Sequence, residues 1–222
     1  MKNYLRLYCN LSLSEYSEEL KKDLVSFILK VCDSILCYNK LVFDVSGGGY
    51  GISKGDSLIG ARTLQNRLIE KGYDKLEGFE ANDHHENHAS GFTIHRYLDD
   101  PYLNLYFSWP IDSQSDTITK IVREASTIVN IFYGYSYSVN NRMIESTETE
   151  IKRGFFSLVS ASHSFNLYSN KELVELKNGK IKAIFPVNVF NQNQVDCHKG
   201  IGLVKTTNIS DELSIWTQLN DL

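Results

Sequence analysis

The sequence has few cysteines and no C-x-x-C pair, the spacing typical of zinc and redox sites. The four cysteines are Cys9, Cys32, Cys37 and Cys197. Cys32 and Cys37 are five residues apart in a segment with helical periodicity, so their side chains would face different directions. We therefore expect free, buried thiols.

Long hydrophobic runs and clusters of positive charge are also missing. The most apolar stretch, LVSFILKVC, is broken by Lys30 and is too short to span a membrane, and the N-terminal segment has no uninterrupted apolar run. The formal net charge is −4 and the pI is about 5.9. Because no apolar run is long enough for a membrane span or a signal segment, we expect a cytoplasmic protein with no membrane partner. Because nucleic-acid binding needs clustered positive charge, we also expect no nucleic-acid partner. A basic protein is its natural complement.

No motif for catalysis or cofactor binding is complete. The stretch SGGGYGIS, residues 46 to 53, follows a predicted strand but lacks the last glycine of G-x-G-x-x-G. The Gly179-Lys180 pair precedes Ile181 rather than the Ser or Thr of a phosphate-binding loop. The sequence therefore predicts no enzyme and no cofactor, and we interpret the glycine-rich stretch as a turn that exposes Tyr50.

The residues that are present suit a folded core, since 42% of the 222 residues are hydrophobic and 12% are aromatic. Residues 4–9 alternate as a strand, and a capping box of Ser12 with Glu15 predicts a helix that ends near Cys37. Residues 41–45 predict the next strand. The apolar face of the helix consists of Leu20, Leu24, Phe27, Ile28, Val31 and Ile35.

The order of strand, helix and strand returns later in the chain. Residues 102–109 predict a strand, residues 115–131 a helix and residues 132–139 a second strand. The first strands of the two units contain the similar sequences LRLY (5–8) and LNLY (103–106). This similarity indicates two related β-α-β halves, with chance as the alternative.

The remaining segments complete the predicted fold. Between the two units, a helix begins near Asp56 and ends at Gly72. The last third predicts short strands separated by polar, Asn/Gln-rich turns. With only three prolines and no Gly/Ser-rich linker, we expect one domain over 1–222, with a division into 1–140 and 141–222 as the alternative. The predicted class is α+β, with a mixed or antiparallel sheet covered by helices and a strand-rich C-terminal part.

The stretch NDHHENHASGF, residues 82–92, groups three of the six histidines with two acidic residues. His84 and His88 have the spacing of a helical metal pair, but His88 follows His85 too closely for the H-E-x-x-H of zinc proteases. The neighbouring Asn, Ser and Gly residues favour a solvated loop. We therefore expect a contact surface without a metal. A small metal-dependent hydrolase using His84, His85 and His88 is the alternative.

The region around these histidines is strongly acidic. From residue 74 to residue 100, seven acidic residues face two basic ones, a net charge of −5. Concentrated acid beside exposed aromatic rings steers a basic protein partner into register, and a solvated face is the alternative. Tyr133, Tyr135 and Tyr137 fall on one face of their strand and Phe132 on the other. The predicted partner-binding residues are Glu77, Glu80, Asp83, His84, His85, Glu86, His88, Tyr50 and Trp109.

The segment NGKIKAIFPVNVFNQNQV, followed by GIGLVKTTNISDELSIWTQL, resembles C-terminal regions of bacterial proteins from polymorphic-toxin and type VI secretion loci. In those regions an aromatic-Pro-aliphatic-Asn step precedes a short helix and two final strands. The order of strand, helix, strand, acidic loop and second strand-helix-strand also resembles immunity proteins from such loci.

This resemblance implies a cytoplasmic, non-enzymatic inhibitor that binds a cognate secreted toxin and blocks its active site. A nuclease with a cationic groove would present the complementary charge. The resemblance assigns no contact residue. A structural or assembly component of a phage or secretion apparatus remains a further alternative.

Overall fold

The computed structural model describes residues 2–11, 17–47, 59–83, 88–96, 101–110, 116–139, 170–181, 185–198 and 204–218. The N-terminal elements are β1 (Lys2–Asn10), α1 (Glu18–Ser34), β2 (Leu41–Gly47), α2 (Ala61–Lys71), β3 (Leu76–Asp83) and β4 (His88–His95). The later elements are β5 (Tyr102–Pro110), α3 (Thr117–Ser126), β6 (Asn130–Val139), α4 (Asn170–Lys177), β7 (Val187–Asn191), α5 (Gln192–Cys197), β8 (Val204–Asn208) and β9 (Leu213–Gln218).

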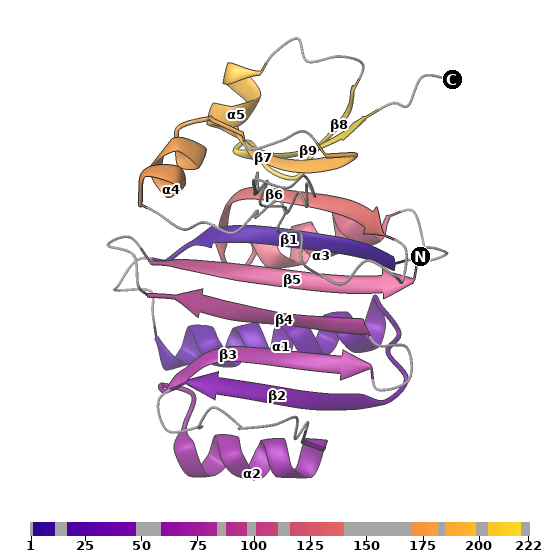
Figure 1. Cartoon of the computed structure of the whole chain (residues 1–222), viewed down its shortest axis with the longest axis vertical. Helices are drawn as coiled ribbons and strands as arrows, with labels where there is room; N and C mark the ends of the chain where they lie inside the picture. The colour runs from indigo at the N-terminus through magenta and orange to yellow at the C-terminus, as the bar shows by residue number, and fades with distance from the viewer. Residues whose placement is uncertain are drawn as a thin grey trace, which may run out of the picture.

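The strands form one nine-stranded sheet in the order β2-β3-β4-β5-β1-β6-β7-β9-β8 (Figure 1). Every neighbouring pair of strands is antiparallel. The α+β class and the antiparallel sheet predicted from the sequence are therefore confirmed. The sheet runs without a break from the strands of the first 140 residues into β7, β9 and β8.

The two strand-helix-strand units cross different numbers of strands. In each unit the helix joins strands that are parallel to each other but not adjacent, because β1 lies between β5 and β6, and β3, β4 and β5 lie between β2 and β1. The similar sequences in β1 and β5 pair with each other, with Leu7 opposite Leu105. The N-terminal strand is thus the centre of the sheet.

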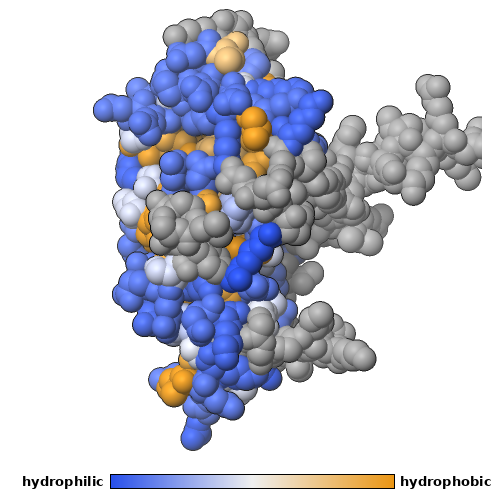
Figure 2. All heavy atoms as spheres, turned by 90° about the vertical axis from the view of Figure 1, so that its left-hand side faces the viewer, coloured by the Kyte–Doolittle hydropathy of each residue, from blue (hydrophilic) through white to orange (hydrophobic). Residues whose placement is uncertain are grey.

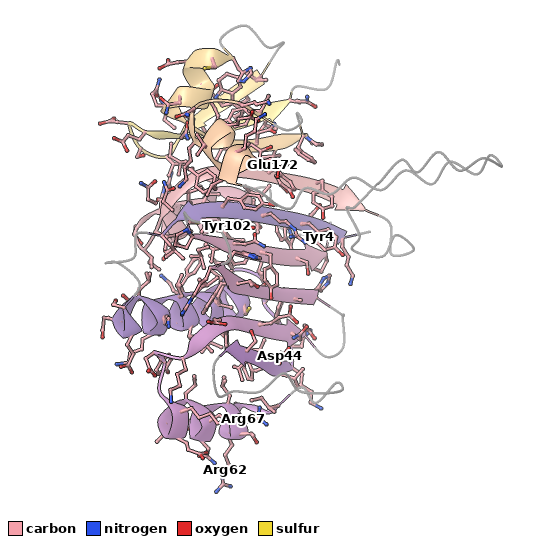
Figure 3. The ribbon with its side chains drawn as sticks, turned by 60° about the vertical axis from the view of Figure 1, so that its left-hand side comes forward. Tyr4, Asp44, Arg62, Arg67, Tyr102 and Glu172 are labelled. Carbon is pink, nitrogen blue, oxygen red and sulfur yellow. The ribbon has the colours of Figure 1, made fainter. Side chains whose placement is uncertain are left out.

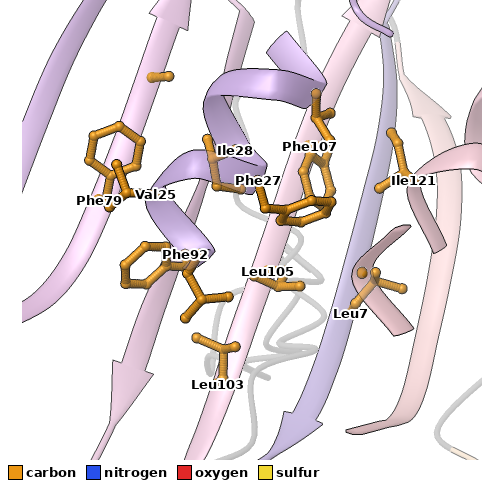
Figure 4. Packing of buried hydrophobic residues seen from close by; sticks show 14 of the residues in the cluster. Leu7, Val25, Phe27, Ile28, Phe79, Phe92, Leu103, Leu105, Phe107 and Ile121 are labelled. Atoms are coloured by element: carbon orange, nitrogen blue, oxygen red, sulfur yellow. The ribbon is translucent and has the colours of Figure 1, made fainter. Parts of the chain in front are cut away.

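One face of the sheet, here called the core face, carries the main hydrophobic core. On β1 this face consists of Leu5, Leu7 and Cys9, and it is covered by α1 and α3 (Figures 1 and 4). The N-cap of α1 is Ser17, whose Oγ accepts a hydrogen bond from the Leu20 amide at 3.1 Å. The helix buries a stripe that includes Phe27, whose ring meets Phe107 edge to face at 5.9 Å.

The opposite face carries aromatic and polar side chains. We call it the tyrosine face, because β1, β5 and β6 place seven tyrosines there: Tyr4, Tyr8, Tyr102, Tyr106, Tyr133, Tyr135 and Tyr137. Four of them, Tyr8, Tyr102, Tyr133 and Tyr135, are fully buried in a second cluster to which α4 contributes Leu173 and Leu176. The prediction that Tyr133, Tyr135 and Tyr137 share a face is confirmed.

Several predicted details are wrong. The helix expected over 115–131 ends at Ser126, because the next residues turn into β6 at Asn130. Phe132 packs with Tyr8 rather than on the core face, since a register shift between Tyr8 and Cys9 leaves it outside the regular alternation. Helix α1 ends at Ser34, close to the predicted end near Cys37, and residues 192–197 form the short helix that the resemblance implied rather than the turn expected from their composition.

The thiols also differ from expectation. Cys9 and Cys32 are buried as predicted, but Cys37 and Cys197 are exposed. Cys37 lies beyond the end of α1 with a positive φ of 54°, so it no longer follows the helical pattern on which its burial was predicted. The capping pair Ser12 and Glu15, and the residues around Asp56, lie outside the described residues.

The visible surface is mainly hydrophilic, with separate hydrophobic spots rather than one continuous patch (Figure 2). Among the described residues, the large hydrophobic side chains that are exposed are Ile69 on α2 and Val174 on α4. No helix in the described ranges is long and apolar enough to cross a membrane.

Candidate functional site

The described residues on both sides of His84 to Asn87 form two paired strands, where the sequence predicted a loop. β3 and β4 pair antiparallel, with Phe79 opposite Phe92 and Asp83 opposite His88. Phe79, Ala81 and Phe92 are buried on the core face, and their alternation outweighs the turn-forming Asn, Ser and Gly residues nearby. The polar residues of this segment are therefore distributed over the two faces of a sheet.

This alternation separates the predicted partner-binding residues. Glu80 is on the tyrosine face, whereas Asp83 is on the core face. Glu77 is half-exposed, and its Oε1 lies 3.5 Å from the Nε of Arg96. Trp109 is a core residue with 2% of its surface exposed, so its indole is not displayed to a partner. His84, His85, Glu86 and Tyr50 lie outside the described residues.

Asp83 and His88 belong to a buried polar cluster under the end of α1. Asp83 is 3% exposed, and its Oδ2 accepts a hydrogen bond from the Asn39 amide at 2.9 Å. His88 is 4% exposed and stacks on Tyr38 with ring centroids 6.2 Å apart. The Tyr38 hydroxyl donates to the Ser108 carbonyl at 2.6 Å. Both predicted site residues thus connect the loop after α1 to the paired strands β3 and β4.

The predicted alternative of a metal site gains no support here. Within the described parts of the chain, no group of three or more His, Cys, Asp or Glu side chains is arranged to hold a metal ion. His88 opens strand β4, so it is not on a helix of the kind that the spacing of His84 and His88 would require.

A line of side chains crosses the tyrosine face from one edge of the sheet to the other. The pairing of neighbouring strands places one residue of each strand on this line, which we call the cross-sheet row. In strand order the row is Asp44, Glu80, Gly91, Tyr106, Arg6, Tyr135, Asn188, Trp216 and Thr206. It begins with two carboxylates and has an arginine between two tyrosines at its centre.

The acidic end of the row is built around Gly91. Glu80 Oε2 accepts a hydrogen bond from the Tyr106 hydroxyl at 2.8 Å, although their strands are separated by β4. A Cβ on Gly91 would lie 2.8 Å from that hydroxyl, so the glycine leaves the space in which Tyr106 crosses β4. Asn82 Nδ2 donates to Glu80 Oε1 at 2.8 Å. Both oxygens of Glu80 are therefore fixed.

Asp44 lies directly opposite Glu80 on β2 and is exposed (Figure 3). Its Oδ1 accepts a hydrogen bond from the Val45 amide at 2.8 Å. Neither Asp44 nor Glu80 forms an ion pair with any described residue. Like charges at directly opposite positions destabilise a sheet, so a cation from outside would relieve this pair.

The centre of the row places a positive charge among phenols. Burial raises the pKa of Tyr106 well above its usual range, and the neighbouring Glu80 carboxylate raises it further. Burial also raises the pKa of Tyr135, whereas the charge of Arg6 opposes that shift. The two tyrosines therefore stay neutral on either side of Arg6, and their hydroxyls are hydrogen-bonded to Glu80 and Tyr8. The arrangement can bind charged groups, with acid at its edge and a cation at its centre.

Sequence reasoning missed Asp44, Tyr106 and Arg6 as site residues. The available signal was the alternation in each strand, which puts Arg6 and Tyr106 on the face opposite Leu5, Leu7 and Leu105. The register that aligns them with Asp44 and Glu80 depends on pairing between distant strands, which alternation within one strand does not determine.

The fold and the cross-sheet row define an α+β protein with a charged and aromatic sheet face. The chain matches no protein-family model and no curated protein. Among solved structures, its fold is similar to that of the Pseudomonas aeruginosa T6SS protein PA0821, with a TM-score of 0.54 and 12% sequence identity. The alignment covers 96% of this chain and 64% of that protein's chain, so the likeness extends over the whole fold described here.

Proposed function

We propose that this protein is a cytoplasmic immunity protein of a type VI secretion locus, which binds a cognate toxin and covers its active site. The observation that carries the proposal is the fold similarity to a T6SS protein over 96% of this chain. The resemblance of the C-terminal segment to proteins of such loci points the same way. The proposed role is binding rather than catalysis.

The acidic end of the cross-sheet row supports a basic partner. The carboxylates of Asp44 and Glu80 are cross-strand neighbours without a described cation, and Glu80 is held in place by Tyr106 and Asn82. A fixed carboxylate loses little conformational freedom when it accepts a lysine or arginine. A toxin with a cationic substrate groove, such as a nuclease, fits this surface, and surface charge of opposite sign would speed its association.

A competition experiment in the native organism tests the proposed role. The gene is deleted, and the deletion strain is grown in contact with the parent strain on a solid surface. An immunity protein predicts that the parent kills the deletion strain, that the wild-type gene restores survival, and that inactivating the parent's type VI secretion abolishes killing. Equal survival of the deletion strain beside a parent with active secretion would contradict the proposal.

Charge variants test the surface once a toxin is identified. We expect Asp44→Asn and Glu80→Gln each to slow association several-fold, with most of the difference lost at high salt. The matched control is Asp33→Asn on α1, an exposed acid on the core-face side. Stopped-flow association rates at low and high salt give the comparison. A control effect equal to that of Asp44→Asn would show that overall charge, rather than this surface, governs binding.

A further inference from the structure

Two adjoining cavities lie at the end of the sheet where β1 ends and β6 begins. Their volumes are about 680 and 360 Å³. They share the residues Asn10, Ile128, Val129 and Asn130, so together they form one elongated depression, which we call the end groove. One arm runs to the first turn of α1, and the other runs to α5 and the turn between β8 and β9.

Five amide side chains contribute to the polar lining of the end groove. They are Asn10, Asn130, Asn191, Gln192 and Asn193. Asn10 lies opposite Asn130 across the paired strands, at the point where the two cavities meet. Asn191, Gln192 and Asn193 already use their side-chain amides within the protein, whereas Asn10 and Asn130 at the junction present a donor and an acceptor each, as does each residue of an extended peptide backbone.

The Asn10 side chain has an unused acceptor. Its Oδ1 is shielded from solvent and has no hydrogen-bond partner among the described residues. A buried acceptor without a partner destabilises a folded protein, so a ligand that supplies a donor gains affinity. Because Asn10 lines both cavities, an N–H of a ligand bound there would satisfy this acceptor.

The charges along the end groove are mainly negative. Glu19 and Asp23 line the α1 arm, and Glu212 lines the other arm. The lining lysine, Lys177, holds its Nζ 5.4 Å from the centre of the Phe132 ring. Glu19 Oε2 already lies 3.8 Å from Lys22 Nζ, and Glu212 and Lys177 offset each other in the larger arm, so Asp23 in the α1 arm is where a positively charged ligand is favoured.

From these features we infer that the end groove binds an extended peptide segment that carries lysine or arginine. The larger cavity alone falls within the range of roughly 300–1,000 Å³ typical of ligand sites. Asn10 and Asn130 would pair with the peptide backbone, Asp23 with a basic side chain, and the half-buried Ile128 with its apolar parts. This inference is independent of the proposed function, because any protein with an accessible basic segment could supply the peptide.

Selection from a displayed library of random 12-residue peptides tests the inference on the whole purified chain. We expect the enriched peptides to carry lysine or arginine, and fluorescence anisotropy then measures their affinity. Asn10→Leu should weaken the best peptide at least tenfold, and Asp23→Asn should weaken it several-fold in a salt-dependent manner. Asp23 is exposed, so its variant keeps the test valid if Asn10→Leu does not fold.

The matched control is Asn3→Leu, at the other end of the same strand, which should bind the peptide as the wild type does. No enrichment of any peptide, enrichment without basic residues, or equal affinity for the wild type and both groove variants would each overturn the inference. The library contains no toxin, so a negative result leaves the competition experiment unaffected.

Discussion

Replacing Gly91 with alanine should push β4 away from β3, because only a residue without a Cβ allows the two strands to approach this closely. The added Cβ would lie 2.2 Å from the Phe79 carbonyl oxygen and 2.8 Å from the Tyr106 hydroxyl. Overpacking of this kind costs typically about 1–3 kcal/mol. Loss of the bond from Tyr106 to the half-exposed Glu80 adds about 1 kcal/mol. We expect the free energy of unfolding to fall by about 3 kcal/mol.

Urea unfolding followed by far-UV circular dichroism at 25 °C measures this change. With a slope of about 2 kcal/mol per M, the midpoint should fall by about 1.5 M. The matched control is Gly60→Ala, since a Cβ there would have no atom within 4 Å; it should cost less than about 1 kcal/mol. If Gly91→Ala costs no more than the control, Tyr106 does not cross β4 in the way described.

Three further predictions concern other parts of the molecule. Burial lowers the pKa of His95, so the unfolded chain binds a proton more readily and stability should fall as the pH drops below about 6.5. His95→Gln should reduce this loss, and urea midpoints at pH 5 and pH 8 would measure the difference. Cys37 and Cys197 should react with Ellman's reagent in the folded protein. Burial raises the pKa of Cys9 and Cys32, so these two thiols should react only after unfolding, and four fast-reacting thiols would contradict their placement. Lys30→Met should change stability by less than about 1 kcal/mol, because its 2.6 Å contact with Glu124 joins exposed side chains; a larger loss in thermal unfolding would contradict a surface ion pair.

The strands that alternation predicted well are those in which every second side chain enters the core. In β1 and β5, leucines recur at every second position, and the structure buries them against α1 and α3. The same rule would have placed Trp109 in the core with Leu105 and Phe107. Its selection as a partner contact relied on residue type, which carries less information than position in a strand.

The paired strands β3 and β4 could not be identified in the same way. Their turn-forming residues have specific tertiary roles: Gly91 makes room for Tyr106, and Asp83 accepts a hydrogen bond from the Asn39 amide. Both roles depend on contacts with residues far away in the sequence, and such contacts override local propensity.

Helix α5 was expected to be a polar turn from its own residues, and only the family resemblance implied a short helix there. The structure shows a reciprocal capping box, in which Asn191 Oδ1 accepts from the Gln194 amide at 3.0 Å and Gln194 Oε1 accepts from the Asn191 amide at 2.8 Å. Asn and Gln three residues apart are a readable signal of a helix start.

The central position of β1 has a consequence for synthesis of the chain. Asn3 hydrogen-bonds to Pro110, 107 residues later, and Ser138 reaches back 135 residues to Asn3. Strand β1 therefore waits for its two neighbours, β5 and β6, while about a hundred or more residues are added, at about 5–20 residues per second. Until β6 emerges, at least one edge of β1 stays unpaired. Folding of this protein should accordingly be slow and late, and truncated chains that end before β6 should be prone to aggregation.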